Sequence, residues 1–585
     1  MRRLLIGTSF ALLAIPAPAS ADANSDLKTL VDAFWAETLK ESPIFASSLG
    51  IDTYANEVGD ASLEAADRRA ASAGAFLKRL DSLPQQQLTA ASKVEAGILR
   101  RTLNSAIEGN GFPQRSINFT TYSSWHQQFA GMANNLPFKS AKDFESYNAR
   151  LKQYEKVNDQ NIAVANVAIE DKLTQPCETL KGYEGTISGL VVTDVTKSRF
   201  FGPYAGKRPE GVSQAEFERL AGDAAAAIET VIHPALSKHL AWYSANYKPA
   251  CATAPGISAQ PGGAKYYAFR VREETTTNLT PEEIHAIGLK EVARIRAEMV
   301  EVATKAGYPT REAFIRHLRT DPQYYAKTPE ELMEKVARVT KAIDGKMPAL
   351  FGRLPRLPYG IREIPAETAE GTTTAYYNPG SPQIGLSGTY YVNTSKLDQR
   401  PFWEIPALSV HEAVPGHHHQ IALQQELPLS DFRKNGAFFT AFVEGWGLYS
   451  ERLGIEMGLY DTPAKDMGRL SYEMWRACRL VVDTGIHSKG WSKQQAIDFM
   501  TDNSALSAAN IEAEVNRYIS WPGQALAYKL GELKIRELRA KATQALGAKF
   551  DLPAFHDAVL GQGAVPLDVL ESQITDWIAA EKAKG

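Results

Sequence analysis

The chain has 585 residues, of which 44% are hydrophobic and 22% charged, a composition typical of a folded protein long enough for more than one domain. Its 64 Lys and Arg nearly balance its 67 Asp and Glu. This balance excludes a global electrostatic field that would attract nucleic acid or an anionic membrane surface, so function is expected to come from a local site.

The first 21 residues have the features of a secretory signal. Arg2 and Arg3 precede an apolar run from Leu4 to Ile15, and residues 19–21 (Ala-Ser-Ala) offer a small-x-small cleavage site. We therefore expect a mature protein that begins near Asp22 and is periplasmic or secreted. The apolar run is short for a membrane span, no comparable run follows, and no cysteine lies near the cleavage site. We expect neither a membrane-spanning helix nor lipid attachment there.

The N-terminal region, residues 22–250, is predicted to consist of long amphipathic helices. Its apolar residues recur at intervals of three and four between stretches rich in Pro, Gly and Asn. The histidines of this region stand singly and are predicted to be structural: His126, His233 and His239. The expected helices cover residues 25–40, 62–83, 88–107, 141–173 and 213–247.

The chain contains three cysteines. Cys177 and Cys251 both lie beside proline in predicted loops, so export to an oxidising compartment favours a disulfide between them, with two free buried thiols as the alternative. Cys478 stands in a helical pattern and is expected in the core.

A stretch rich in Pro, Gly and Ala, residues 250–263, is a possible boundary before a second region, 264–585, which is expected to carry the site. Two helix starts follow it, at 280–283 and 328–331, each with Thr at the N-cap, Pro at N1 and Glu at N3. We expect both regions to form one continuous fold.

β-Branched and aromatic residues between 359 and 394 predict a small sheet. An extended peptide that adds to its edge would meet side chains such as Tyr390 and Asn393. The predicted fold class is therefore mainly α, with a small β-sheet beside the functional cleft.

Four of the 11 histidines lie in one stretch, residues 411–419 (HEAVPGHHH). It is similar to HExxH, in which two histidines one helical turn apart bind zinc and the glutamate handles the proton of a zinc-bound water. Pro415 stands where the second histidine is expected, and it must bulge or kink the helix. A bulge that absorbs two residues would bring His417 beside His411. We prefer this pair, with His418 as the alternative.

A catalytic zinc site usually has three protein ligands and one open position. Glu444 is the best candidate for the third ligand, because its carboxylate stands in an otherwise apolar helix and needs a compensating cation. Gly445 and Gly447 indicate close approach of another part of the chain. Glu451 is the alternative ligand, or a partner of a ligating histidine. Glu412 would then act as general base.

Two further segments offer donors to an oxyanion or to a carboxylate. Arg479 and His487 lie on one polar stripe of an apolar helix, and Arg517 and Tyr528 lie in a segment interrupted by Pro and Gly. Tyr528 or His487 would stabilise an oxyanion, and Arg479 or Arg517 would bind a peptide carboxylate. A structural role is the alternative for each of these four residues.

Five motifs carry a family resemblance. HEAVPGHHHQ (411–420) and EGWGLYSE (444–451) resemble the paired signatures of a large bacterial family catalogued as domain of unknown function 885. YYVNT (390–394), RLVVDTGIHSKGWS (479–492) and WPGQALAYKLG (521–531) resemble its other motifs, so the resemblance extends over essentially the whole mature chain. His419 departs from a family pattern that is usually apolar at this position, which argues that His419 is not a ligand.

That family in turn is similar to the helical gluzincin metallopeptidases. The resemblance implies one Zn²⁺ bound by His411, His417 and Glu444, with Glu412 as the base, in a helical fold with a small sheet beside the cleft. It also favours short or unfolded peptides as substrates. We therefore expect a zinc metallopeptidase, whose end specificity and oligomeric state the sequence leaves open. The rival hypotheses are a zinc amidase acting on cell-wall peptides and a non-enzymatic binding protein with a degenerate metal site.

Overall fold

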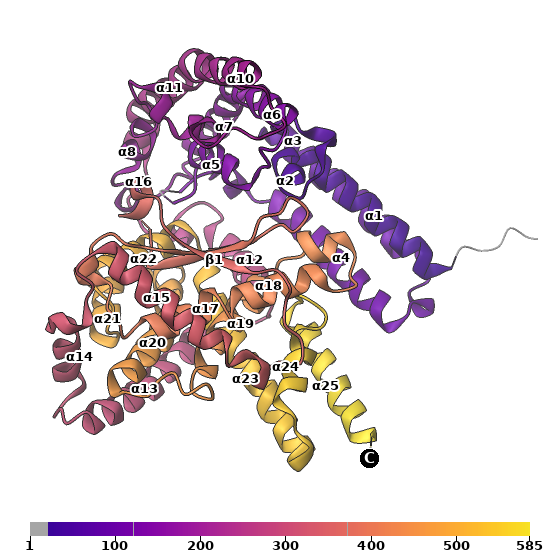
Figure 1. The fold of residues 1–585 in the computed structure, drawn as a ribbon. Coiled ribbons are helices and arrows are strands. Elements are labelled where there is room, and N and C mark those ends of the chain that lie inside the picture. The colour runs from indigo at the N-terminus through magenta and orange to yellow at the C-terminus, as the bar shows by residue number, and fades with distance from the viewer. Residues whose placement is uncertain (1–21, 121, 371, 585) are drawn as a thin grey trace, which may run out of the picture.

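A computed structural model describes residues 22–120, 122–370 and 372–584. These residues form a mainly helical protein with one small sheet, as predicted (Figure 1). The predicted leader, residues 1–21, lies outside the described residues. Asp22 is the N-cap of the first helix, α1 (Ala23–Glu41), and its side chain accepts a hydrogen bond from the amide of Asn24. Within the described ranges, no helix is long and apolar enough to cross a membrane.

The long N-terminal helices follow the predicted pattern with two differences. The helix expected over 141–173 is divided into α6 (Ala141–Leu151) and α7 (Tyr154–Glu170). The helix expected over 213–247 is continuous, but two π-helical segments, 228–232 and 243–247, flank α11 (His233–Trp242). Pro234 lacks the amide that would close a regular turn at the first of these segments, which favours the wider π geometry there. The other helices of this region are α2 (Pro43–Ser48), α3 (Leu63–Ser82), α4 (Ala90–Asn110), α5 (Trp125–Gly131), α8 (Tyr183–Ser188), α9 (Gly202–Ala205) and α10 (Gln214–Ala227).

The predictions for His126, His239 and the cysteines agree with the structure. His239 stacks on Trp125 with ring centroids 4.3 Å apart, inside the N-terminal core. Cys177 and Cys251 form a disulfide, and Cys478 is buried.

Two helix pairs form the frame of the C-terminal region. α13 (Pro281–Lys305) packs on α20 (Pro463–His487), and α19 (Thr440–Leu453) packs on α23 (Ala527–Leu546). A Cβ on Gly445 would lie 2.5 Å from the backbone of Gly531, so this contact between α19 and α23 needs glycine, as the sequence indicated.

The N-terminus of α13 carries the predicted capping box between Thr280 and Glu283. At α15 (Pro329–Asp344) Thr328 caps the helix, but the carboxylate of Glu331 accepts from the amide of Lys327 instead. The remaining helices are α12 (Gly263–Thr275), α14 (Arg311–Thr320), α16 (Ala366–Ala369), α17 (Ile405–Glu412), α18 (His417–Glu426), α21 (Lys493–Asn503), α22 (Ala508–Ser520), α24 (Leu552–Leu560) and α25 (Leu567–Ala583).

The sheet has three strands in the order β1-β3-β2. β1 (Tyr359–Glu363) is parallel to β3 (Gly388–Val392), and β2 (Ala375–Asn378) is antiparallel to it. β3 is therefore the central strand and β2 an edge strand. In Figure 1 the sheet crosses the middle of the molecule, between the N-terminal helices and the helices of the C-terminal region.

Candidate metal centre

The histidine-rich stretch is divided between two helices rather than bulged within one. α17 ends at Glu412 and α18 begins at His417, and the intervening peptide between Val414 and Pro415 is cis. A Cβ on Gly416 would lie 1.9 Å from the carbonyl oxygen of His411, so only glycine fits where the loop folds back over the end of α17. The expected kink is thus a complete break, and it brings the ring centroids of His411 and His417 to 4.7 Å.

α19 brings Glu444 to these two histidines. Its Oε2 lies 3.5 Å from Nε2 of His411 and 3.4 Å from Nε2 of His417. Among the described residues, these three form the one group of three or more His, Cys, Asp or Glu whose ligand atoms all lie within 4.8 Å of one another. Two imidazole nitrogens and one carboxylate oxygen are a donor set that zinc takes in hydrolytic sites.

The electrostatics of the cluster favour a cation. Burial alone would raise the pKa of Glu444, but His417 and His411 hold it well below its ordinary value. Burial lowers the pKa of His411, but the carboxylates of Glu444 and Glu451 raise it by more, and the resulting pKa is about 9. Oε2 of Glu444 is buried and has no hydrogen-bond partner. Buried carboxylate oxygens normally have a hydrogen-bond donor or a cation beside them, and a metal ion would fill this role for Glu444. The three residues therefore fit a metal ion.

His418 lies outside the cluster. Its Nε2 is 2.9 Å from the carbonyl oxygen of Leu357, and its Nδ1 is 2.9 Å from the hydroxyl of Tyr377. Because a carbonyl can only accept, Nε2 carries the proton and Nδ1 accepts from the hydroxyl. Burial also lowers the pKa of His418 to about 4. This neutral histidine joins α18 to the sheet, and neighbouring His419 packs on the ring of Phe351.

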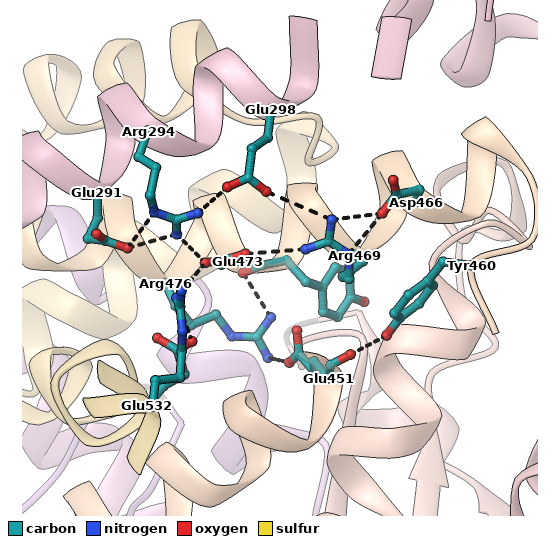
Figure 2. Close-up of polar contacts among 12 residues, drawn as sticks. Glu291, Arg294, Glu298, Glu451, Tyr460, Asp466, Arg469, Glu473, Arg476 and Glu532 are labelled. Carbon is teal, nitrogen blue, oxygen red and sulfur yellow. Dashed lines mark hydrogen bonds and ion pairs between the residues drawn. The ribbon is translucent and has the colours of Figure 1, made fainter. Parts of the chain in front are cut away.

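Glu451, the alternative ligand, lies behind His411. Its Oε1 is 2.8 Å from Nδ1 of His411 and 2.9 Å from Nη2 of Arg476. The hydroxyl of Tyr460 donates to its backbone carbonyl, and Figure 2 shows Glu451 between Arg476 and Tyr460. This position suits a carboxylate that orients a ligating imidazole. The sequence analysis did not select Arg476, although it lies only three residues before Arg479 on the same apolar helix.

A buried ion network lies next to Arg476 on α20 (Figure 2). Its centre is Glu473, which pairs with Arg294 of α13, with Arg469 of its own helix and with Lys529 of α23. Lys529 is fully buried and also lies 2.9 Å from Glu532. Because each charge has partners of opposite sign, the network fixes how α13, α20 and α23 pack behind the cluster.

A cavity of about 1480 Å³ opens onto the cluster. His411, Glu412, His417 and Glu444 lie in its wall, and the facing wall comes from the N-terminal region, including Phe119. Residues of both regions therefore line the candidate site.

Three of the predicted polar residues meet beside the cluster. The ring of Tyr528 lies parallel to that of His411, with centroids 6.3 Å apart. The hydroxyl of Tyr528 accepts from Nη2 of Arg517 at 2.9 Å, and Cζ of Arg479 lies 4.0 Å from the centroid of its ring. Both arginines pair with Glu514, at 2.7 Å from Arg479 and 3.3 Å from Arg517.

His487 does not reach the cavity. Its Nδ1 accepts from the amide of Ile257 at 3.0 Å, and its Nε2 donates to the carbonyl of Tyr518 at 2.9 Å. Burial lowers its pKa to about 4. Both nitrogens join elements of the fold, so the position of His487 does not match the predicted role of oxyanion donor.

Tyr390 and Asn393, which were expected to contact a peptide, also lie outside the cavity wall. Tyr390 is fully buried in the central strand, and the amide of Asn393 donates to backbone carbonyls of the loop before β2. The cavity is lined instead by Tyr376, Tyr377 and Tyr391, which the sequence analysis missed. The alternation of side chains along a strand was the available signal, because it separates residue 391 from its buried neighbour.

The fold and the site together define a class: a mainly helical protein in which two histidines and a glutamate converge at a large cavity. A family model described as a bacterial protein of unknown function (DUF885) matches residues 43–574, and the chain belongs to this family. The family named from the sequence motifs is thereby confirmed.

The solved structures that are similar to this chain include two bacterial proteins. One, described as a “putative lipoprotein” from Colwellia psychrerythraea, is 28% identical with a TM-score of 0.89, covering 95% of this chain and 100% of the other. The second, described as a “putative lipoprotein of unknown function” from Shewanella oneidensis, is 20% identical with a TM-score of 0.71 and the same coverage, which is a likeness of fold. No curated protein matches the chain.

Proposed function

We propose that the protein is an extracytoplasmic zinc metallopeptidase that hydrolyses peptides in the cavity. The observation that carries this proposal is the convergence of His411, His417 and Glu444 beside Glu412 in the cavity wall. The location is supported by the sequence of the leader and by the description of the similar structure from Colwellia psychrerythraea as a “putative lipoprotein”. A cavity of about 1480 Å³ that is lined by polar and aromatic side chains is large enough for a short peptide.

The side chains divide the work of hydrolysis. His411, His417 and Glu444 would hold zinc, which supplies Lewis acidity toward water and the scissile carbonyl. Glu412 follows His411 directly and lines the cavity. Its carboxylate would accept the proton of the attacking water and return it to the leaving amine. Tyr528 accepts from Arg517, which leaves its own hydroxyl hydrogen to donate to the oxyanion.

The test compares metal content with activity. Elemental analysis should find about one zinc per chain in the wild type and His418→Ala, and little in His417→Ala. The wild type should cleave a mixed peptide library, whereas Glu412→Gln should retain zinc and lose at least about a hundredfold in rate. A wild-type protein that binds no zinc and cleaves nothing after zinc is supplied would overturn the proposal.

The rival hypothesis of a cell-wall amidase makes a different prediction. A peptide attached to a glycan strand would bring the strand to the cavity of about 1480 Å³ as well, whereas a free peptide would not. Release of peptides from purified cell-wall material, with no cleavage of the library, would favour the amidase instead.

A further inference from the structure

We infer that Arg517 and Arg479 form a subsite for the free carboxylate at the C-terminal end of a peptide, so that the protein acts as an exopeptidase on that end. The cleavage step of this inference rests on the proposed function. The binding step does not, because a carboxylate can be held whether or not a bond is broken.

The first argument is a local excess of positive charge. Arg479 and Arg517 share one carboxylate, that of Glu514. Nearby Glu274 pairs with Arg270, and the carboxyl of Asp483 is used by the hydroxyl of Tyr267 and the amide of Gly523. One positive charge of the two arginines therefore has no carboxylate of its own. An uncompensated charge in a buried site is costly, and an anionic ligand would offset that cost.

The second argument is an incomplete set of hydrogen bonds. Arg479 donates through Nε to Tyr518 and through Nη2 to Glu514, but its Nη1 is buried without a partner. Buried guanidinium groups are usually fully hydrogen-bonded, so the charge of Arg479 is only partly compensated by the residues around it.

The third argument concerns access. Both arginines lie in the cavity wall, but only 2% of the Arg479 side chain is exposed, against 18% of that of Arg517. Arg517 is therefore the contact group, and Arg479 reinforces its charge from behind. Gln524 and Tyr528 each accept from Nη2 of Arg517 and fix the plane of its guanidinium. Both hydrogens of Nη2 and one of Nη1 are thereby used, so a carboxylate would be held by the charge of Arg517 and by the remaining hydrogen of Nη1 or that of Nε.

The fourth argument is distance. The contacts through Tyr528 place Cζ of Arg479 no more than about 10 Å, and Cζ of Arg517 no more than about 12 Å, from the ring centroid of His411. An extended peptide advances roughly 3.3–3.6 Å per residue. A peptide whose terminal carboxylate is bound here would thus extend only one or two residues beyond the scissile bond. The reaction would be addition of water across that peptide bond, releasing a C-terminal amino acid or dipeptide.

The binding test uses the Glu412→Gln protein loaded with zinc, so that substrate is not consumed. Two pools of N-acetylated hexapeptides, randomised at every position, end in a free carboxylate or in a carboxamide. Retention of each pool by the protein is measured by ultrafiltration and mass spectrometry. We expect the acids to bind at least about tenfold more tightly than the amides, because the charge-assisted hydrogen bonds require the carboxylate. Adding Arg517→Gln should lower the preference below about threefold without weakening amide binding.

Arg539→Gln is the matched control. Arg539 also contacts a tyrosine hydroxyl, that of Tyr449, and a carboxylate, that of Glu456, but it lies outside the cavity wall. The substitution Arg539→Gln should leave the preference for acids over amides unchanged. If circular dichroism shows that Arg517→Gln does not fold, Arg517→Lys serves instead, since it keeps the charge and loses the planar guanidinium with its fixed donors; its preference should fall to an intermediate value.

The outcomes separate the two proposals. Equal binding of acids and amides overturns the carboxylate subsite, whatever the wild type cleaves. Preferential binding of acids with products from internal bonds supports the subsite and overturns the exopeptidase action. Preferential binding of acids without any cleavage by the zinc-loaded wild type supports the subsite and overturns the proposed peptidase function.

Discussion

Oε1 of Glu451 lies 2.8 Å from Nδ1 of His411, on the side of the imidazole opposite the Nε2 that faces Glu444. The carboxylate beside Nδ1 helps to raise the pKa of His411, and it leaves Nε2 as the nitrogen that faces a cation at Glu444. Arg476 lies 2.9 Å from the same carboxylate oxygen, and both side chains are almost fully buried. The orientation of His411 is therefore set by a pair of residues that need not touch metal or substrate.

Replacing Glu451 by Gln should lower zinc affinity by about 10–100-fold, because the amide can still accept from Nδ1 but carries no charge. Competition with a chelator of known affinity measures this loss. Glu456→Gln is the control, since Glu456 pairs with Arg539 away from the cavity and should leave zinc affinity unchanged. Wild-type affinity in Glu451→Gln would mean that packing alone orients His411.

The absence of a side chain at Gly447 leaves room for the imidazole of His411. A Cβ at this position would lie 2.7 Å from Cε1 of His411 and within 3.0 Å of both ring nitrogens. We expect Gly447→Ala to move the imidazole, lower zinc affinity by at least about tenfold, and lower the free energy of unfolding by about 1–3 kcal/mol. Chelator competition and urea unfolding measure the two effects.

Gly97→Ala is the control for this substitution. Gly97 lies in α4, where an added Cβ would meet nothing within 4 Å, so it should stabilise the helix by about 0.5–1 kcal/mol and leave zinc affinity as it is. If Gly447→Ala bound zinc like the wild type, the ring of His411 would have to find another position in which it still binds metal.

The disulfide between Cys177 and Cys251 joins residues 74 positions apart. In the chain-entropy model, a loop of this length contributes about 4 kcal/mol to the free energy of unfolding. The double substitution to Ser should therefore lower the denaturation midpoint in urea, while zinc content stays at the wild-type level because neither cysteine lies in the metal cluster. An unchanged midpoint would show that strain in the bonded form cancels the entropic gain.

The sequence predicted the elements whose signals are local. Helix periodicity, caps and the β-branched segment located most helices and all three strands, and the apolar surroundings of Glu444 singled it out as a residue in need of a cation. The pairing of Cys177 with Cys251 followed from their loop positions and the expected export.

What the sequence could not give is the direction in which a polar side chain points. Arg479, Asp483 and His487 share one helical stripe, yet only Arg479 lines the cavity, whereas His487 is used by backbone groups of two other segments. Likewise, the strand of Tyr390 is central because β1 joins it in parallel, a long-range pairing that no local pattern encodes. The division of the histidine stretch into two helices followed from Pro415, but its extent depended on the fit of Gly416 against α17.

The buried carboxyl of Asp483 makes stability depend on pH. It accepts from the hydroxyl of Tyr267 at 2.6 Å and from the amide of Gly523, yet burial dominates and raises its pKa to about 7, against an ordinary value of 3.8. Between about pH 4 and 7 the folded protein therefore holds a proton that the unfolded chain releases. The free energy of unfolding should fall as pH rises through this window, by up to about 1.4 kcal/mol per pH unit from this group, and level off above pH 7. Glu404, whose pKa burial also raises to about 7, adds a second slope of the same sign.

Asp483→Asn removes one of these two titrations. Urea unfolding at pH 5 and at pH 8 should show a smaller loss of stability between the two pH values in the variant than in the wild type. Asp461→Asn, at an exposed position, should lose as much as the wild type. Comparing the difference between two pH values, rather than stability at one, cancels any constant cost of fitting the amide beside Gly523. An equal loss in Asp483→Asn and wild type would mean that Asp483 is already ionised in the folded protein at pH 5, with Tyr267 and Gly523 compensating its buried charge.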